Sequence, residues 1–355
     1  QWLGELEEWA FRLLYEMTGH YNYTILASLG ILVILLGLVV MAWATRRLIR
    51  TMIGVVMPGE SENLSDLIFS NLQLSKGPKV VVIGGGTGLS VMLRGLKAKT
   101  YNLTAVVTVA DDGGSTGRIR QDLDIIAPGD LRNCLVALAD KEGLMEKLFA
   151  HRFGGSGNLT GHSFGNLFIA ALIEVLGDVE EAMDATSKVL RVRGKVIPSS
   201  AEKIRLNAEM TDGRIVEGES QIPHAHGKIK RVFTTPEHPK AIQSAVRAIQ
   251  EADAIVLGPG SLYTSIMPNL CVPDIVQAVR TSKAPKIYIC NVMTQPGETD
   301  DYTVSDHVKA INRQAGGRVI DFVIANNGDV DPAVLQRYVA TGSHPVIIDK
   351  KEKMK

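Results

Sequence analysis

A short apolar run followed at once by glycines is the feature of this sequence that most constrains its fold. Residues 80–83 read Val-Val-Val-Ile, and four of the five residues from Gly84 to Gly88 are glycine, with Thr87 as the exception. An apolar run of that length is typical of a buried strand, and glycines let backbone N–H groups come close to a ligand. We expect a helix to open at about Leu89 and to add the positive end of its dipole. The segment therefore predicts a strand, a phosphate-binding turn and a helix.

The spacing of these glycines matches neither of the common nucleotide-binding motifs. Gly84-x-Gly86-x-Gly88 lacks the two-residue gap of the dinucleotide fingerprint, and no Lys-Ser/Thr ending of a P-loop follows. Generic NAD or ATP chemistry is therefore not favoured. The competing interpretation of Gly84, Gly85, Gly86 and Gly88 is a tight turn that needs glycine only for packing.

The chain from Pro78 onward alternates short apolar runs with helical patterns. This alternation predicts an α/β fold, with a doubly wound and mostly parallel sheet of the Rossmann-like kind. Asp212-Gly213, between alternating residues of 205–220, adds a small antiparallel hairpin insertion. The expected parallel strands are Val80–Ile83, Thr104–Val109, Ala254–Leu257, Lys286–Cys290, Phe322–Ile324 and Val346–Ile348.

Polar residues follow the expected strands of the first half, where ligands bind in such sheets. Asp111 and Asp112 can hold a magnesium ion, accept a hydroxyl proton or bind a sugar or base, or else only cap a turn. The first turns of the next two helices offer further polar groups, and the histidine among them is favoured as a hydrogen-bonding partner over a metal ligand. These groups belong to Arg132, Asn133, His162, Ser163 and Asn166.

The second half of the chain repeats the design of glycine plus hydroxyl groups. Gly260, Ser261, Tyr263, Thr264 and Ser265 follow the strand Ala254–Leu257 and form a second candidate phosphate site. After the next expected strand come Thr294, Gln295 and Glu298, whose amide and carboxylate groups can contact a base or a sugar.

Charge and cysteine content exclude several classes of function. Lys and Arg together number 38, as do Asp and Glu, so no excess of positive charge favours a nucleic-acid partner. The three cysteines, Cys134, Cys271 and Cys290, have no CxxC spacing, which argues against a disulfide framework and a zinc site.

An uncharged stretch near the N-terminus predicts a membrane span. Residues 23–45 contain no Asp, Glu, Lys or Arg and are long enough to cross a bilayer, although a buried globular helix is an alternative. Arg46, Arg47 and Arg50 follow directly, and the residues before the stretch are acidic, so the positive-inside rule places the rest of the chain in the cytoplasm. The expected location is the cell membrane, with a single span.

Six motifs, in order, carry a family resemblance. They are VVIGGGTGLSVMLRGLK, VTVADDGGSTGRIRQD, APGDLRNCLVALA, GHSFGNL, LGPGSLYTSIMPNL and NVMTQPGETD, and together they resemble the YvcK/CofD family over essentially residues 78–344. The segments DDGGSTGR and PGDLRNCL are more similar to the YvcK branch, whose members are called gluconeogenesis factors or UDP-N-acetylglucosamine-binding proteins. The membrane anchor departs from the soluble pattern of the family.

The resemblance implies a Rossmann-like domain that binds UDP-N-acetylglucosamine with no required cofactor. It implies a regulatory role that links carbon metabolism in gluconeogenic growth to peptidoglycan synthesis and cell shape, with cell-wall synthesis proteins as partners and a homo-oligomer left open. The matching positions are Gly84–Gly88 and Ser261–Ser265 for the phosphates, Asp111 and Asp112 with Asn166 for the distal moiety, and Thr294–Glu298 for the other end of the nucleotide.

The other branch of the family supplies the alternative function. CofD is a 2-phospho-L-lactate transferase, which moves a phospholactyl group from a guanine-nucleotide donor to a deazaflavin acceptor. In that case Asp111 and Asp112 would position magnesium and the acceptor hydroxyl. The resemblance by itself does not establish an enzymatic activity.

The expected organisation has five parts. Residues 1–22 form an interfacial amphipathic segment, 23–45 the transmembrane helix, 46–77 a juxtamembrane helix and linker, 78–349 the YvcK/CofD-like nucleotide-sugar-binding domain, and 350–355 a tail.

Overall fold

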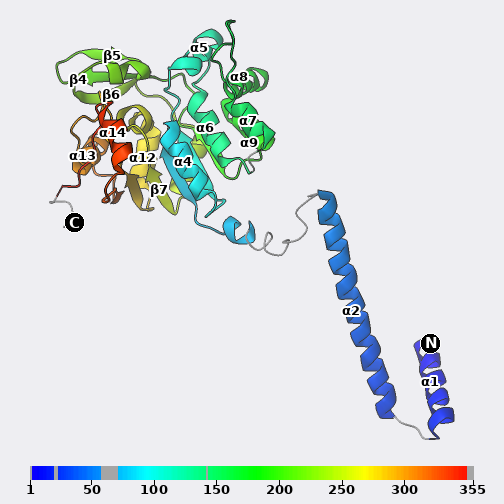
Figure 1. The fold of residues 1–355 in the computed structure, drawn as a ribbon. Coiled ribbons are helices and arrows are strands. Elements are labelled where there is room, and N and C mark those ends of the chain that lie inside the picture. The colour runs from blue at the N-terminus through cyan, green and yellow to red at the C-terminus, as the bar shows by residue number, and fades with distance from the viewer. Residues whose placement is uncertain (1, 20–22, 57–70, 141–142, 350–355) are drawn as a thin grey trace. The chain divides into compact units, whose positions relative to one another are not determined.

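The computed structural model describes residues 2–19, 23–56, 71–140 and 143–349 (Figure 1). It divides into two compact units, Gln1–Asn71 and Leu72–Lys355. Much of the predicted linker and the predicted tail, residues 57–70 and 350–355, lie outside the described residues.

The larger unit is built on a six-stranded sheet in which every neighbouring pair is parallel. The strand order is β3-β2-β1-β7-β8-β9. The strands are β1 (Val80–Gly84), β2 (Leu103–Val107), β3 (Lys195–Pro198), β7 (Ala254–Leu257), β8 (Lys286–Ile289) and β9 (Phe322–Ile324). The predicted α/β class with a mostly parallel sheet is confirmed.

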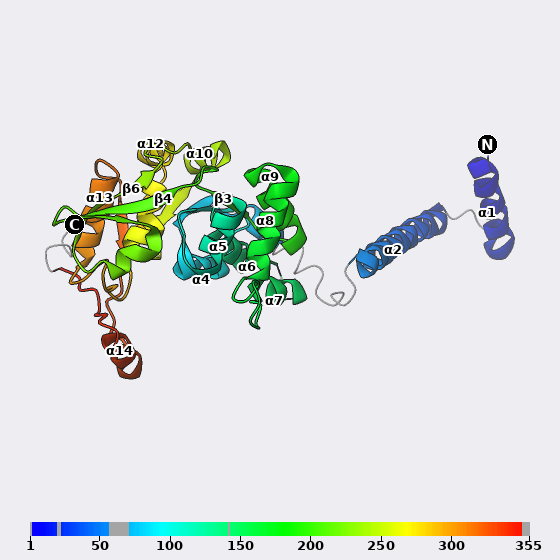
Figure 2. The same ribbon diagram turned by 90° about the horizontal axis from the view of Figure 1, so that it is seen from above.

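Helices connect these strands and lie on both sides of the sheet, with α4 on one side and α10 and α12 on the other (Figure 2). They are α4 (Gly86–Leu96), α5 (Gly114–Leu123), α6 (Gly129–Leu138), α7 (Leu144–Ala150), α8 (Phe164–Leu176), α9 (Val179–Leu190), α10 (Gln243–Gln250), α11 (Met267–Leu270), α12 (Pro273–Thr281), α13 (Val304–Gln314) and α14 (Pro332–Val339). The side chains of the central strands are almost completely buried, as the apolar runs predicted.

Two details of the predicted sheet are wrong. Val346–Ile348 does not form a strand. The N–H of Val346 donates to the carbonyl of Val292, and the carbonyl of Ile347 accepts from the N–H of Val304, so this segment pairs with the loop after β8 and the start of α13 instead of with the sheet. The edge strand β3 was not predicted, because only four residues form it and the last of them is a proline.

The predicted hairpin is present as part of a larger insertion. Strands β4 (Arg205–Met210) and β5 (Ile215–Glu217) are antiparallel and turn at Gly213, while β6 (Ile229–Thr235) pairs on the other side of β4. The short 3-10 helix η2 (Glu219–His224) follows β5. The insertion is therefore a three-stranded sheet, not a lone hairpin.

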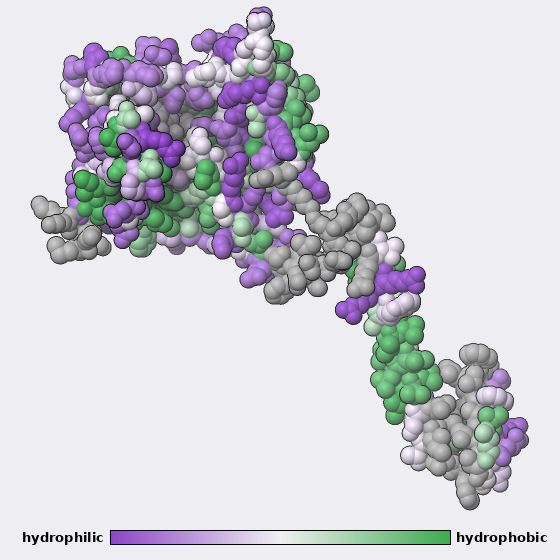
Figure 3. All heavy atoms as spheres, in the orientation of Figure 1, coloured by the Kyte–Doolittle hydropathy of each residue, from purple (hydrophilic) through white to green (hydrophobic). Residues whose placement is uncertain are grey.

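The smaller unit contains α1 (Trp2–Thr18) and α2 (Tyr23–Val56), the second being 34 residues long. Its stretch Gly30–Ile49 has the length and apolar composition of a membrane span, and none of it is buried. Figure 3 shows the apolar surface as a band along this helix, and charged residues follow it. The predicted uncharged helix thus exists, although it is longer than residues 23–45. At ~1.5 Å per residue, these 20 residues match a hydrocarbon core of about 30 Å.

Candidate functional site

The direction of the chain connections reverses between β1 and β7. From β1 the chain proceeds outward to β2 and β3, whereas from β7 it proceeds the other way to β8 and β9. Such a switch point is where open α/β sheets bind ligands, outside the carboxyl ends of the strands. The two glycine-rich segments, 84–88 and 258–265, follow these two strands and therefore lie side by side.

Part of the glycine content serves the contact between these two loops. A Cβ atom on Gly88 would lie 3.0 Å from the carbonyl oxygen of Pro259, and one on Gly260 would lie 3.1 Å from that of Gly85. The packing interpretation therefore accounts for Gly88 and Gly260. Gly86 has φ +69° and starts α4, three residues before the predicted Leu89. The free N–H groups of the first helical turn thus lie at the strand end itself.

The first turns of α4, α5, α6 and α8 meet at this edge of the sheet. The N–H of Gly86 donates to the carboxylate of Asp130 in the first turn of α6. Ser115 Oγ, in the first turn of α5, accepts from the N–H of Ser163 at 3.2 Å, directly before α8. Helix N-termini carry partial positive charge and unpaired N–H groups, so their convergence favours an anion.

Carboxyl groups from several elements crowd the same edge. Burial, and next the charge of Asp111, raises the pKa of Asp130 to about 6. Burial, followed by the charges of Asp111, Asp112, Glu298 and Asp130, raises the pKa of Glu219 to about 8. Glu219 comes from η2 of the insertion, so it is brought to the cleft only by tertiary structure. Neither Asp130 nor Glu219 is among the site residues predicted from the sequence.

The two aspartates after β2 have different partners. Asp112 accepts the N–H of Glu219 at 3.1 Å and that of Ser220 at 2.8 Å, so it caps η2 and attaches the insertion to the sheet. Asp111 accepts the N–H of Gly113 at 2.9 Å, and its other oxygen lies beside Gly129 at the start of α6. The turn-capping interpretation therefore fits Asp112 and one oxygen of Asp111, while the other oxygen of Asp111 stays among the groups that face the cleft.

Arg132 is a buried cation with one unused donor. Its Nη2 donates to Asn133 Oδ1 at 2.6 Å, and its Nη1 is buried without a hydrogen-bond partner. Burial, with Arg152 as the next cause, lowers the pKa of Arg132, while Asp130 and Asp111 oppose that shift. Together with Thr87, the pair lines a hollow of about 210 Å³ between α4 and α6. A buried unpaired guanidinium nitrogen is costly, and a phosphate oxygen would satisfy it.

The start of α8 supplies a second unsatisfied polar group. His162 Nδ1 lies 3.3 Å from Ser115 Oγ. Asn166 Nδ2 makes long contacts of 3.4 Å to Ser115 Oγ and 3.5 Å to Thr116 Oγ1, and its Oδ1 is buried without a partner. An amide oxygen with no donor can accept a hydroxyl or N–H group from a ligand.

The loops after β7 and β8 instead satisfy each other. Glu298 is 3% exposed and accepts from the N–H of Tyr263, from Thr264 Oγ1 at 3.0 Å and from Gln295 Nε2. Burial raises its pKa to about 7 against these bonds. Thr294 is paired with His344 through two hydrogen bonds of 2.7 and 2.9 Å.

The ring of Tyr263 points out of the cleft. Its hydroxyl is 2.7 Å from that of Tyr302, and the ring lines a separate groove of about 720 Å³ beside β6. Tyr263 therefore contributes its backbone N–H, and not its ring, to the hydrogen bonds between the loops after β7 and β8. Among the described residues, no three His, Cys, Asp or Glu side chains are arranged to hold a metal ion.

Comparisons with known sequences and solved structures point to the same family. The sequence model of the family described as 2-phospho-L-lactate transferase CofD matches residues 80–355. The gluconeogenesis factor of Bacillus subtilis is 52% identical over 279 residues, which cover 79% of this chain and 88% of that protein. A solved structure of a UPF0052 family member from Bacillus halodurans is similar, with 52% identity, a TM-score of 0.77, and coverage of 79% of this chain and 90% of that one.

A protein of Nostoc sp., described as a candidate gluconeogenesis factor, is 52% identical over 323 residues. That match covers 91% of this chain and 71% of the Nostoc protein. The unit from Leu72 to Lys355 holds 284 of 355 residues, or 80%, so the match also extends into the residues before Leu72.

Proposed function

The chain belongs to the CofD family, with gluconeogenesis factors as its close relatives, and from this premise we propose that it is a membrane-tethered regulator that binds UDP-N-acetylglucosamine between β1 and β7. The observation that carries the proposal is the pair of buried, unpartnered groups at one edge of the sheet, Arg132 Nη1 and Asn166 Oδ1. Both are costly in isolation and both can be satisfied by one polar ligand.

The diphosphate occupies the region between the two glycine-rich loops and the first turns of the helices. The N–H groups at the start of α4 and the guanidinium of Arg132 are its donors. The crowded carboxyl groups stay compatible with this anion because the raised pKa values of Asp130 and Glu219 keep part of them neutral near pH 7.

The sugar extends toward α8, where Asn166 Oδ1 accepts one of its hydroxyl or amide hydrogens. Asp111, beside Gly129, accepts another. The uridine lies toward the loops after β7 and β8, where Glu298 fixes the backbone of Tyr263 and Thr264.

The apolar stretch Gly30–Ile49 anchors this domain to the cytoplasmic face of the membrane. Cell-wall synthesis proteins are the partners that we expect at that surface. In this role, cell-wall synthesis proteins respond to whether the cleft holds a UDP-sugar. The chain would in this way affect cell shape during gluconeogenic growth. The names of the relatives support the link to carbon metabolism.

The test of ligand binding is isothermal titration of the unit Leu72–Lys355 with UDP-N-acetylglucosamine, UDP-glucose and GDP, with and without magnesium. We expect saturable binding of UDP-sugars with no release of nucleotide. Absence of saturable binding to any of the three would refute the proposal. The tether is tested apart from this: the full chain should stay in carbonate-washed membranes, and the unit from Leu72 should not.

A transferase activity is the second candidate, and the cluster of Asp111, Asp130 and Glu219 favours it. A carboxyl group with a pKa of about 8 can donate or accept a proton near neutral pH. Magnesium would need oxygens of the donor's phosphates in addition to these carboxylates, as is usual for this ion. In this case a phospholactyl group would pass from a guanine-nucleotide donor to a deazaflavin hydroxyl, and the guanine nucleoside monophosphate would be released. Magnesium-dependent release that requires the acceptor would establish it.

A further inference from the structure

The end of the main sheet has an apolar face that the described residues of the large unit leave open. Phe322 and Ile324 of β9 are 61% and 56% exposed. The parallel register places them beside Ile287 and Ile289 of β8, which are only partly buried. Tyr288, between these two, points to the opposite face and stacks on His307 of α13. We call the four residues Ile287, Ile289, Phe322 and Ile324 the β8–β9 face.

Helix α14 is an amphipathic helix with no buried residue. Its apolar residues Val334, Leu335, Tyr338 and Val339 follow the i, i+4 spacing of one helical stripe. Figure 2 shows α14 projecting from the body of the large unit. Asp331 caps the helix by accepting the N–H groups of Ala333 and Val334. Eight residues are too few for a stable isolated helix, so α14 needs a packing partner.

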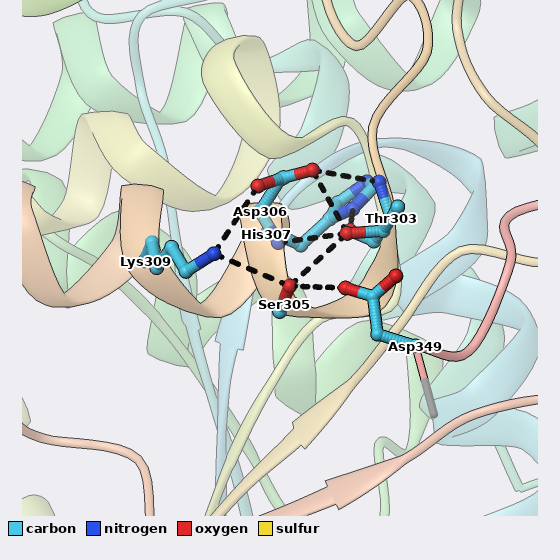
Figure 4. A network of polar contacts seen from close by, with 6 residues as sticks. All are labelled: Thr303, Ser305, Asp306, His307, Lys309 and Asp349. Carbon is cyan, nitrogen blue, oxygen red and sulfur yellow. Dashed lines mark hydrogen bonds and ion pairs between the residues drawn. The ribbon is translucent and has the colours of Figure 1, made fainter. Parts of the chain in front are cut away.

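The segment that bears α14 is held at both ends. It leaves the sheet at Ile324, and it returns where His344 pairs with Thr294. Beyond that, Ile347 accepts the N–H of Val304, and Asp349 accepts from Ser305 Oγ at the start of α13, as Figure 4 shows. Residues 325–343 are thus a projecting arm with fixed roots, which we call the α14 arm.

We propose that a second copy of this chain covers the β8–β9 face with its α14 arm, and that the exchange is reciprocal. A helix that follows a strand in an α/β sheet normally packs on that sheet, and α14 is the helix that follows β9. Each copy therefore carries one uncovered apolar helix and one uncovered apolar face. A twofold exchange of the same element buries both pairs at once, which makes a second copy the occupant that this chain itself specifies.

The arm is also connected to the candidate site. Its root residue His344 makes both hydrogen bonds that hold Thr294, four residues before Glu298. The dimer would thereby fix the loop that Glu298 joins to Tyr263 and Thr264. The dimer itself does not depend on the identity of the ligand.

The test is disulfide trapping of the full chain in membranes. One tagged chain carries Phe322→Cys and a second, differently tagged chain carries Tyr338→Cys. We expect mild oxidation to produce a disulfide between the two tags. Replacing Tyr338→Cys by Gln336→Cys, on the other side of α14, is the matched control. A mixed disulfide that is no more abundant than with Gln336→Cys would overturn the proposal.

A second pair of substitutions protects the test from folding artefacts. Leu335→Asp, added to the Tyr338→Cys chain, places a charge on the apolar stripe and should lower the mixed disulfide by about tenfold. Arg337→Asp, off the stripe, should leave it unchanged. Both positions are on helix α14, which has no buried residue, so the folded yield should not change. Equal yields from the two variants would overturn the proposal, as would lipid-only photo-crosslinking from position 338, which would mean that the stripe rests on the bilayer.

Discussion

The two halves of the cleft are built from similar sequence patterns but use their polar groups differently. After β1 and β2, Arg132 Nη1 and Asn166 Oδ1 are buried without partners, and carboxyl groups crowd one another. After β7 and β8, Glu298 accepts three hydrogen bonds and Thr294 is paired with His344. Glycine-plus-hydroxyl loops alone therefore do not identify the binding half. We assign binding to the half after β1 and β2 because Arg132 Nη1 and Asn166 Oδ1 lie together with the converging helix starts, where one ligand can remove the cost of both.

The largest expected effect is on the half of the cleft after β7 and β8, which we call the closed half because Glu298 and Thr294 are paired within the protein. Glu298→Ala leaves the N–H of Tyr263, Thr264 Oγ1 and Gln295 Nε2 without their acceptor. We expect a loss of about 3–5 kcal/mol in the free energy of unfolding, since each buried donor left unpaired costs about 1–3 kcal/mol. Urea denaturation of the large unit measures this.

Glu298→Gln is the matched control for this change. It keeps one acceptor oxygen and a neutral group in a site where the carboxyl pKa is already raised to about 7. Its cost should be about 1 kcal/mol. If Glu298→Ala kept normal stability and lost only ligand affinity, the closed half would be a binding half and the comparison would fail.

The half of the cleft after β1 and β2, which we call the open half because Arg132 Nη1 and Asn166 Oδ1 lack partners, should respond in the opposite way. Arg132→Met removes the unpaired Nη1 together with the charge, so folding should be retained while UDP-N-acetylglucosamine affinity falls by about 10- to 100-fold, as expected for a lost charge-assisted bond. Calorimetry measures the affinity and denaturation the stability. Arg132→Lys should lie between the two, because it keeps the charge without the fork of donors. An unchanged affinity in Arg132→Met would remove Arg132 from the site.

Asp112 provides a structural contrast within the open half. Asp112→Ala removes the acceptor for the N–H groups of Glu219 and Ser220, so it should destabilise the insertion by about 1–2 kcal/mol, the usual cost of a lost helix cap. Hydrogen exchange in β4 and β5 would report this locally. Asp111→Asn should instead spare stability and weaken the ligand, and the reverse pattern would exchange the roles of the two aspartates.

The sequence predicts the central sheet well because its signals are local. Val80–Ile83, Ala254–Leu257 and Phe322–Ile324 are continuous apolar runs between breakers, and each is a strand in the structure. Val346–Ile348 has the same composition, but its backbone groups pair with Val292 and Val304 and not with a strand of the sheet. Composition predicts an extended segment, whereas the available partner decides whether it joins a sheet.

The candidate site was predictable in its loops but not in its charges. Gly86, Asp111, Arg132 and Asn166 each stand next to a strand end or a helix start, which is a signal in the sequence itself. Glu219 is brought to Asp111 only when Asp112 caps η2, an interaction across more than a hundred residues. No local pattern contains that information, so the pKa of Glu219 follows only from the fold.

The smallest expected effect on ligand affinity, and the one that tests the electrostatics of the open half, is the dependence on pH. The raised pKa values of Asp130 and Glu219, about 6 and about 8, mean that the folded state holds protons that the unfolded state has already lost. The free energy of unfolding should therefore fall as pH rises from about 4 to about 8. In the same range new negative charge appears beside the diphosphate, so affinity should weaken by about fivefold between pH 6 and 8.5, as expected for about 1 kcal/mol of repulsion.

Glu219→Gln separates this cause from a general effect of pH on the protein. The amide cannot ionise, so both the stability and the affinity of the variant should change less above pH 6. Glu217→Gln, on exposed β5, is a control that should retain the native profile. If Glu219→Gln and the native chain had the same pH profile, the carboxyl crowding would not govern the cleft, and only the unpaired Arg132 and Asn166 would still distinguish its open half from its closed one.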